Sequence, residues 1–332
     1  MSLKLSVLDQ CPIHNGKTAS EALHDTLALA QLCDEAGYHR YWIAEHHDTP
    51  SYASSCPEVL IGQVAARTRQ IRVGSGGVML NHYSPYKVAE VFRTLNAYYP
   101  DRIDLGFGRA PGGAENSSQA LAWPRGPLSA DYYEESVSLL QGFLRDRVEG
   151  VRAMPYAGAA PGLWTLGSSA GSVGLAAHLG LGFVLALFIG THERPAEIIQ
   201  AYRQQFQPAA PGEQPQAIIA TAVICADTEE EARLLAASHV YWKVLAFRHG
   251  IREGLLPPEE ALKQIKKRPA ADQAYFQETL DTIVTGTPVQ CREQLQQTAD
   301  FYAVDELMCV NVLWDFAARK RSYALLAQAF AD

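Results

Sequence analysis

The sequence lacks any apolar run long enough to cross a membrane. A spanning helix needs roughly 18–20 consecutive apolar residues, and no stretch of the 332 residues approaches that length. Residues 1–9 also lack the basic segment followed by an apolar one that marks a secretory signal. We therefore expect a cytoplasmic protein with no membrane partner.

Paired cysteines and a surplus of positive charge are absent as well. The six cysteines are scattered and none forms a C-x-x-C pair, so we expect reduced thiols. Acidic residues outnumber basic ones by 36 to 28, which gives a formal net charge of -8. That balance provides no general attraction to nucleic acid, and we expect no nucleic-acid partner.

Two common binding motifs are missing. Residues 9–14, which follow the first apolar segment, read DQCPIH and cannot form the glycine cradle of a dinucleotide-binding fold. Glu45, His46 and His47 are potential metal ligands, but neighbours in sequence rarely all point at one ion. The H-x-x-x-H spacing of a helical metal site is also absent. We predict no metal.

The sequence does contain eight short apolar segments that alternate with helical patterns. Several are apolar on both faces, as expected for parallel strands covered by helices. Such a series predicts one (β/α)8 TIM-barrel domain over residues 1–332, with an open doubly wound sheet as the alternative. The segments are residues 4–8, 41–44, 71–74, 103–107, 163–166, 183–188, 217–225 and 306–312.

Two connections between the predicted strands are long. One covers residues 108–130 after the fourth strand, and the other covers residues 247–288 before the eighth. Loops of this length are usually functional or disordered. At the C-terminal face of a barrel they would form lids.

Chemically useful residues follow the second and third predicted strands. In a barrel such positions point into the active site. An imidazole of His46 or His47 could hold or move a proton near pH 7, although either ring could instead cap a turn or pack against a loop. Gly74, Gly76 and Gly77 leave the backbone bare for a large flat ligand; a bulge or barrel corner is the alternative.

An anion site is predicted from the fourth and fifth strands. Arg109 follows the fourth, and its planar guanidinium suits phosphate. Residues 167–172 read GSSAGS and open a helix, so bare amides and hydroxyls meet a helix N-terminus. A surface salt bridge and an ordinary helix cap are the respective alternatives. Adjacent strands place adjacent loops side by side, so both groups could hold one phosphate.

Four motifs together resemble the bacterial-luciferase-like flavin monooxygenases. They are residues 44–47 (AEHH), 74–80 (GSGGVML), 102–109 (RIDLGFGR) and 285–288 (TGTP), in the same order over nearly the whole chain. The resemblance implies a (β/α)8 barrel that binds reduced flavin mononucleotide (FMN) at its C-terminal face. Gly108 stands where luciferases carry cysteine and Gly167 where they carry an acidic residue, so light emission is not expected.

The resemblance also assigns roles. His46 is implied as the catalytic histidine near the reactive edge of the flavin, and the Gly76–Gly77 bond as the family's non-prolyl cis peptide beneath the isoalloxazine ring. Asp9 and His47 are candidates for the substrate pocket, with a turn cap equally open for Asp9. The predicted cofactor-binding residues are Gly76, Gly77, Asn81, Arg109, Tyr133, Gly167, Ser168 and Ser169.

The predicted activity is oxygenation of a small organic substrate with O2 and reduced FMN. A separate flavin reductase would supply the FMN, because the chain shows no nicotinamide fingerprint. The resemblance further suggests a homodimer. Two alternatives stay open: a deazaflavin F420-dependent oxidoreductase that transfers hydride without oxygen, and a non-catalytic flavin-binding protein.

Overall fold

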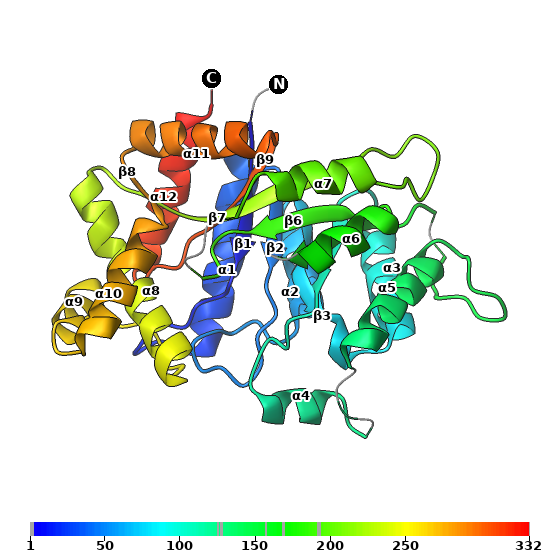
Figure 1. Cartoon of the computed structure of the whole chain (residues 1–332), viewed down its shortest axis with the longest axis horizontal. Coiled ribbons are helices and arrows are strands. Elements are labelled where there is room, and N and C mark those ends of the chain that lie inside the picture. Colours follow the sequence, from blue (N-terminus) through cyan, green and yellow to red (C-terminus); the bar gives the residue numbers. More distant parts are fainter. Residues whose placement is uncertain are drawn as a thin grey trace.

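The computed structural model describes residues 3–124, 126, 129–156, 158–167, 170–190 and 194–331. Figure 1 shows strands gathered at the centre of the molecule with helices around them. The predicted cofactor residues Ser168 and Ser169 lie outside the described residues. Within the described ranges, no helix is both long and apolar enough to cross a bilayer.

Eight parallel strands close into a barrel, which confirms the predicted fold. β1 pairs with β2 on one side and β9 on the other, and β6 pairs with β7, so the ring has no open edge. In ring order the strands are β1 (Lys4–Asp9), β2 (Arg40–Ile43), β3 (Arg72–Met79), β4 (Ile103–Gly108), β5 (Gly162–Gly167), β6 (Gly182–Ala186), β7 (Ala217–Cys225) and β9 (Glu306–Val310).

Helices follow the strands and cover the outside of the barrel. They are α1 (Ala19–Glu35), α2 (Pro57–Arg67), α3 (Pro85–Tyr98), α5 (Ala130–Leu144), α6 (Ala170–His178), α7 (Glu197–Gln205), α8 (Glu229–His249), α11 (Pro288–Tyr302) and α12 (Phe316–Ala329). A short 3-10 helix, η1 (Leu80–His82), follows β3, and α4 (Glu115–Leu121) lies within the connection after β4.

The connection before the last barrel strand is largely helical. It contains α9 (Pro258–Ile265), α10 (Ala270–Asp281) and a short strand, β8 (Val284–Gly286), which pairs with β7 beside the barrel. α9 and α10 pack on α8 through buried residues such as Ile265, Phe276 and Leu280, and Figure 1 shows the three helices together. Burial of these apolar faces explains why this stretch forms helices.

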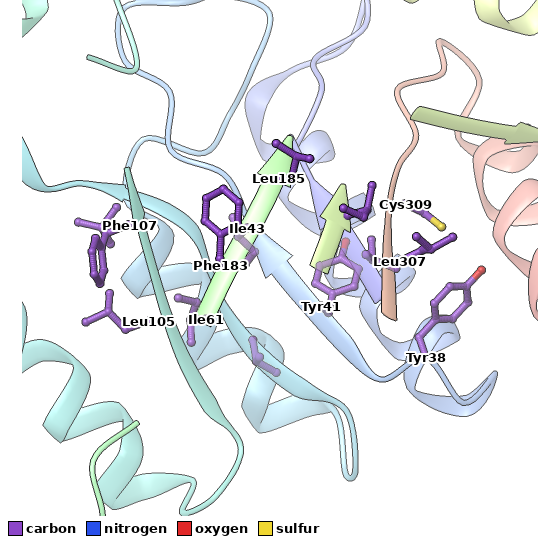
Figure 2. Close-up of a cluster of buried hydrophobic side chains, with 14 of the residues drawn as sticks. Tyr38, Tyr41, Ile43, Ile61, Leu105, Phe107, Phe183, Leu185, Leu307 and Cys309 are labelled. Atoms are coloured by element: carbon purple, nitrogen blue, oxygen red, sulfur yellow. The ribbon is translucent and has the colours of Figure 1, made fainter. Parts of the chain in front are cut away.

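Side-chain parity divides each strand between two cores. Successive side chains of a strand point to opposite faces, so Tyr41 and Ile43 of β2 lie on the outer face, and Arg40 and Trp42 on the inner. The outer core lies between strands and helices (Figure 2), and includes Leu105, Phe183 and Leu307. In this core the apolar segments of the sequence pack against the surrounding helices.

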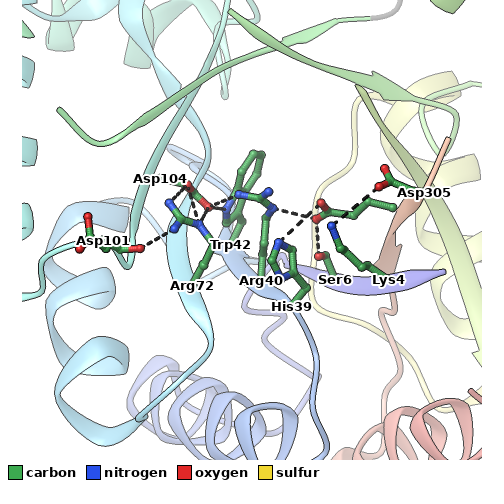
Figure 3. Close-up of polar contacts among 10 residues, drawn as sticks. Lys4, Ser6, His39, Arg40, Trp42, Arg72, Asp101, Asp104 and Asp305 are labelled. Atoms are coloured by element: carbon green, nitrogen blue, oxygen red, sulfur yellow. Dashed lines mark hydrogen bonds and ion pairs between the residues drawn. The ribbon is translucent and has the colours of Figure 1, made fainter. Parts of the chain in front are cut away.

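The inner face carries a charged cluster at the N-terminal end of the barrel (Figure 3). Arg40 donates to Oδ2 of Asp104 and to Oε1 of Glu306, both at 2.8 Å, and Arg72 reaches Oδ1 of Asp104 at 2.6 Å. Burial alone would favour the neutral acid, but Arg40 and Arg72 hold the pKa of Asp104 below its ordinary value. Four strands are thereby cross-linked by buried ion pairs.

We expect Arg40→Met to lower the free energy of unfolding by about 3–5 kcal/mol, because it leaves buried carboxylates short of a partner. Urea unfolding would measure the loss. The matched control is Arg321→Met, which breaks an ion pair to Asp227 whose side chains are both more than half exposed. That variant should lose less than about 1 kcal/mol, and similar losses for the two would contradict a special role for the buried cluster.

Candidate active site

The two adjacent histidines after β2 have different surroundings. The His46 ring stacks on Tyr52 with centroids 4.5 Å apart, and its Nδ1 is buried without a hydrogen-bond partner among the described residues. The ring of His47 is held by Glu45, whose Oε1 lies 2.6 Å from Nε2. Of the pair, His46 has the ring nitrogen that is available to a ligand.

Burial lowers the pKa of His46 to about 4, and the neighbouring His47 and Arg252 add to this effect. The imidazole is therefore neutral at pH 7. A neutral ring has one nitrogen that donates and one that accepts, so it can exchange a proton with a bound group without carrying a charge first.

A polar cluster around Glu45 joins the ends of β2 and β3. Besides His47, the carboxylate accepts from the hydroxyl of Tyr83 at 2.7 Å and from the backbone N–H of Met79 at 3.1 Å. His47, a predicted pocket residue, has its ring hydrogen bonds inside this cluster, and its ring also lies edge-on to that of His82. The sequence did not reveal that Glu45 and Tyr83 belong to one polar cluster. Glu45 is 34 residues from Met79 and 38 residues from Tyr83 in the chain.

The glycines of β3 form a backbone surface with no space for side chains. The bond between Gly76 and Gly77 is cis, as the resemblance implied. A Cβ on Gly77 would lie 2.8 Å from Cα of Phe107, and one on Gly76 would lie 2.5 Å from Cδ1 of Leu8. Since β2 and β3 are paired, His46 and this glycine surface share the same rim of the barrel.

Three of the predicted cofactor residues come together after β3 and β4. Nδ2 of Asn81 donates to the carbonyl of Arg109 at 2.8 Å, while Oδ1 of Asn81 is buried without a partner. The Tyr133 hydroxyl is buried next to Thr165, a side chain that can hydrogen-bond to it. Burial raises the pKa of Tyr133 to about 12, and Thr165 and Arg109 oppose part of this rise. Arg109 itself is exposed.

Gly167 lies at the end of β5 against the first turn of α6. A Cβ on Gly167 would overlap the Ser172 hydroxyl, so glycine is required for this close approach. The ends of β4 and β5 are adjacent, since a Cβ on Gly108 would lie 3.8 Å from the carbonyl oxygen of Leu166. The structure thus brings the Arg109 loop and the start of α6 to neighbouring positions.

Asp9 does not lie with these residues. It shares the outer face of β1 with Val7, and its carboxylate accepts from Arg319 at 2.7 Å and from Thr26 at 2.8 Å. It also accepts from the Tyr41 hydroxyl and the backbone N–H of Cys11. All four contacts are buried, so the carboxylate is used to hold α1 and α12 to the barrel. The predicted place of Asp9 in the substrate pocket is corrected; strand parity could have revealed this.

Several buried polar atoms that have no partner among the described residues lie at the C-terminal end of the strands, and others lie on the surrounding helices. Those at the strand ends include His46 Nδ1, Asn81 Oδ1 and Nε1 of Trp314 after β9. Native proteins pair about nine in ten such groups, so a cluster of exceptions at one end fits a ligand with several polar atoms. Gly76 and Gly77 lie at the same rim and pack closely against Leu8 and Phe107. These residues therefore suit a flavin-type cofactor.

A groove of about 560 Å³ lies at the opposite end of the barrel, with Lys4, Asp34, His39 and Arg72 among its lining residues. None of the buried unpartnered atoms of the described residues belongs to its lining. Its charged groups already form hydrogen bonds or ion pairs with other parts of the protein. The groove therefore does not meet the polar requirements of the cofactor.

A closed parallel barrel with functional groups at the C-terminal ends of its strands is the architecture of barrel enzymes. The family model of luciferase-like monooxygenases matches residues 3–304, and the chain belongs to that family. It is 38% identical over 335 residues to N-acetyl-S-alkylcysteine monooxygenase of Bacillus subtilis (strain 168), with 98% of both chains covered. The crystal structure of apo-MsnO8 has 39% identity and a TM-score of 0.89, with 99% of this chain and 98% of that one covered.

Among more distant structures with the same fold, one is bound to FMN and another is of an F420-dependent enzyme. The oxygenating constituent of 3,6-diketocamphane monooxygenase from Pseudomonas putida, in complex with FMN, has a TM-score of 0.75 and 18% identity over 99% of this chain and 97% of that one. The F420-dependent tetrahydromethanopterin reductase from Methanopyrus kandleri has a TM-score of 0.68 and 14% identity over 99% and 98%. At such identities the likeness concerns the fold alone.

The glycine surface yields a paired prediction. Gly77→Ala should lower the free energy of unfolding by about 1–3 kcal/mol, because the new methyl meets backbone that cannot move aside. Gly76→Ala should cost less, since the atom it meets is a terminal methyl of Leu8. Urea unfolding of both variants gives the comparison. A larger loss for Gly76→Ala would contradict the packing described here.

Proposed function

We propose that this protein is a flavin-dependent monooxygenase that uses O2 and reduced FMN to oxygenate a small organic substrate. A separate flavin reductase supplies the reduced FMN. The observation that carries the proposal is the set of buried polar atoms, among them His46 Nδ1 and Asn81 Oδ1, that have no partner in the described part of the chain and lie at one rim of a closed barrel. The monooxygenase named among the relatives supports the same activity.

The proposed cofactor site has two parts. The flavin ring lies at the rim formed by Gly76 and Gly77, next to His46. Arg109, Tyr133 and Asn81 hold the phosphate, together with Gly167 and the two serines that follow it in the sequence, Ser168 and Ser169. A guanidinium and helix-terminal amides both favour a dianion. Bound reduced FMN supplies the electrons with which O2 is activated.

His46 holds or moves a proton at the reactive edge of the ring. Its neutral imidazole can donate from one nitrogen and accept at the other, and Tyr52 fixes the ring plane from below by stacking. Aromatic residues around it, including Tyr52 and Trp242, form an apolar wall that restricts water. His47 orients the neighbouring loop through its contact with Glu45. It does not itself contact the substrate.

One experiment distinguishes FMN from F420 as the cofactor, and an enzyme from a non-catalytic flavin-binding protein. The protein is titrated anaerobically with reduced FMN and with reduced F420, and oxygen is then admitted while the absorption spectrum is followed. We expect binding of FMN and an oxygen-dependent spectral change. Binding of F420 alone would favour hydride transfer, and FMN binding with no change in its oxidation kinetics would favour a flavin-binding protein. Sedimentation of the same sample would test the predicted homodimer.

We expect His46→Ala to retain FMN binding but to slow oxygenation by about 10²–10⁴-fold, because it removes a proton-transferring group without touching the phosphate site. Stopped-flow kinetics and a flavin-binding titration measure the two properties separately. His24→Ala, at an exposed position on α1, is the control. Unchanged turnover in the His46 variant would give that ring a packing role only.

Arg109→Ala should weaken FMN binding by about tenfold to a hundredfold, which is the contribution of one charge-assisted contact. Riboflavin lacks the phosphate, so its affinity should change much less. Fluorescence quenching of each flavin measures both constants. Arg69→Ala, an exposed arginine at the other end of the barrel, is the control. Equal losses for FMN and riboflavin would mean that Arg109 supports the loop and does not read the phosphate.

A further inference from the structure

Lys243 of α8 is a buried cation without an acidic partner among the residues that the structure describes. Only 5% of the residue is exposed, and Nζ donates to the backbone carbonyl of Phe188 at 2.7 Å. An ammonium group has three N–H donors, and this is the one hydrogen bond that Nζ makes among the described residues. Burial lowers the pKa of Lys243 to about 8, so the side chain is still charged at pH 7.

The position of Lys243 relates it to the candidate active site. Phe188 follows the C-terminal end of β6, and Trp242, next to Lys243, packs with Trp42 and Ala44 of the barrel. The Trp242 ring lies 5.2 Å from that of Tyr52, which stacks on His46. The rings of Trp242 and Tyr52 thus connect α8 to the proposed catalytic histidine, and Phe188, the partner of Lys243, packs against the same cluster as Trp242.

The surroundings of Lys243 do not neutralise it. His239, one helical turn earlier on α8, is uncharged because burial and the charge of Lys243 hold its pKa well below the ordinary value. The acid nearest to His46 in sequence, Glu45, is occupied by His47, Tyr83 and a backbone amide. Arg252, which contributes to the low pKa of His46, adds a second positive charge and forms no ion pair within the described ranges.

A buried charge without a counter-ion is unfavourable for folding. Methionine or leucine would fill the same space at no such cost, and the carbonyl of Phe188 would lose one hydrogen bond only. The position is therefore best explained by a ligand that brings the missing negative charge. The phosphate of the proposed cofactor is already provided for by Arg109 and the start of α6, after β4 and β5.

We propose that Lys243 binds the carboxylate of the substrate, so that the enzyme acts on small organic acids whose apolar part lies along Trp242 and Tyr52. This inference rests on the proposed function, because it assigns the substrate class of that site. It gives each end of the substrate a partner: the ammonium fixes the acid group, and the aromatic side chains direct the apolar part toward His46.

Matched pairs of carboxylates and amides test the proposal. Butanoate, hexanoate and octanoate, and their primary amides, are titrated into the full-length protein with and without oxidised FMN, by calorimetry and by tryptophan fluorescence. We expect at least one carboxylate to bind about tenfold or more tightly than its amide. Lys243→Met should reduce that carboxylate to the affinity of its amide, a loss of about tenfold to a hundredfold.

Three controls make the outcome decisive. Lys267→Met removes the same charge at an exposed position and should leave the preference for carboxylates unchanged. The melting temperature of Lys243→Met should equal or exceed that of the wild type, whereas a structural lysine would lower it. The affinity for FMN relative to riboflavin should be the same in both proteins, whereas a selective loss of FMN would assign Lys243 to the phosphate.

The inference is overturned if every carboxylate binds no better than its amide, or if Lys243→Met retains the preference. Its failure is distinct from that of the proposed function. A protein that binds FMN and consumes oxygen, but shows no carboxylate preference, remains a monooxygenase with another substrate class. A protein that prefers carboxylates through Lys243 but binds no FMN has the anion site without the proposed reaction.

Discussion

The indole of Trp42 inside the barrel is the constraint on which both ends of the structure depend. Its Nε1 donates to Asp104 at 3.1 Å, which ties it to the charged cluster below. Its ring and Cβ lie so close to β3 and β4 that a Cβ on Gly74, Gly76 or Gly106 would come within 3.3 Å of it. Trp42 shares the interior with other large side chains such as Trp164 and Leu8. A Cβ on Gly74 or Gly106 would also meet the backbone carbonyl of Asp104 or Ser75, respectively, so the close packing of the strands and of Trp42 together requires glycine at these positions.

The two ends of the barrel satisfy their polar groups in different ways. At the N-terminal end, Arg40, Arg72, Asp104 and Glu306 pair with one another inside the protein. At the C-terminal end, polar atoms such as His46 Nδ1 have no protein partner. Barrel enzymes commonly divide stability and function between these faces. Here the division is visible in the hydrogen bonding: the charges of the lower cluster are satisfied without a ligand, and the groups of the upper rim are complementary to one.

Local sequence was sufficient to predict much of this, because strands and their ends have local signatures. The eight apolar segments and the rim position of His46 could be predicted in this way, and the family resemblance implied the cis bond at Gly76–Gly77. Asp9 was misplaced because its position after a strand was considered without the side of the strand that it shares with Val7. Tyr83 and Lys243 carry no local signal: a tyrosine before a helix and a lysine within one are ordinary, and only the packing of distant elements brings Tyr83 to Glu45 and buries Lys243.

The distribution of charge within the fold adds a final constraint. The chain as a whole carries a formal charge of -8, yet Arg109, Lys243 and Arg252 at the C-terminal rim form no ion pairs among the residues described. An anion within about a Debye length of 8–10 Å of these cations is attracted by them despite the net negative charge of the chain. The inference on Lys243 requires two anions to be held at once, the cofactor phosphate and a substrate carboxylate. Arg109 after β4 and Lys243 beside β6 are separate cations, so the two negative charges need not lie together. The apolar surface between these cations remains available for the part of the substrate that is oxygenated.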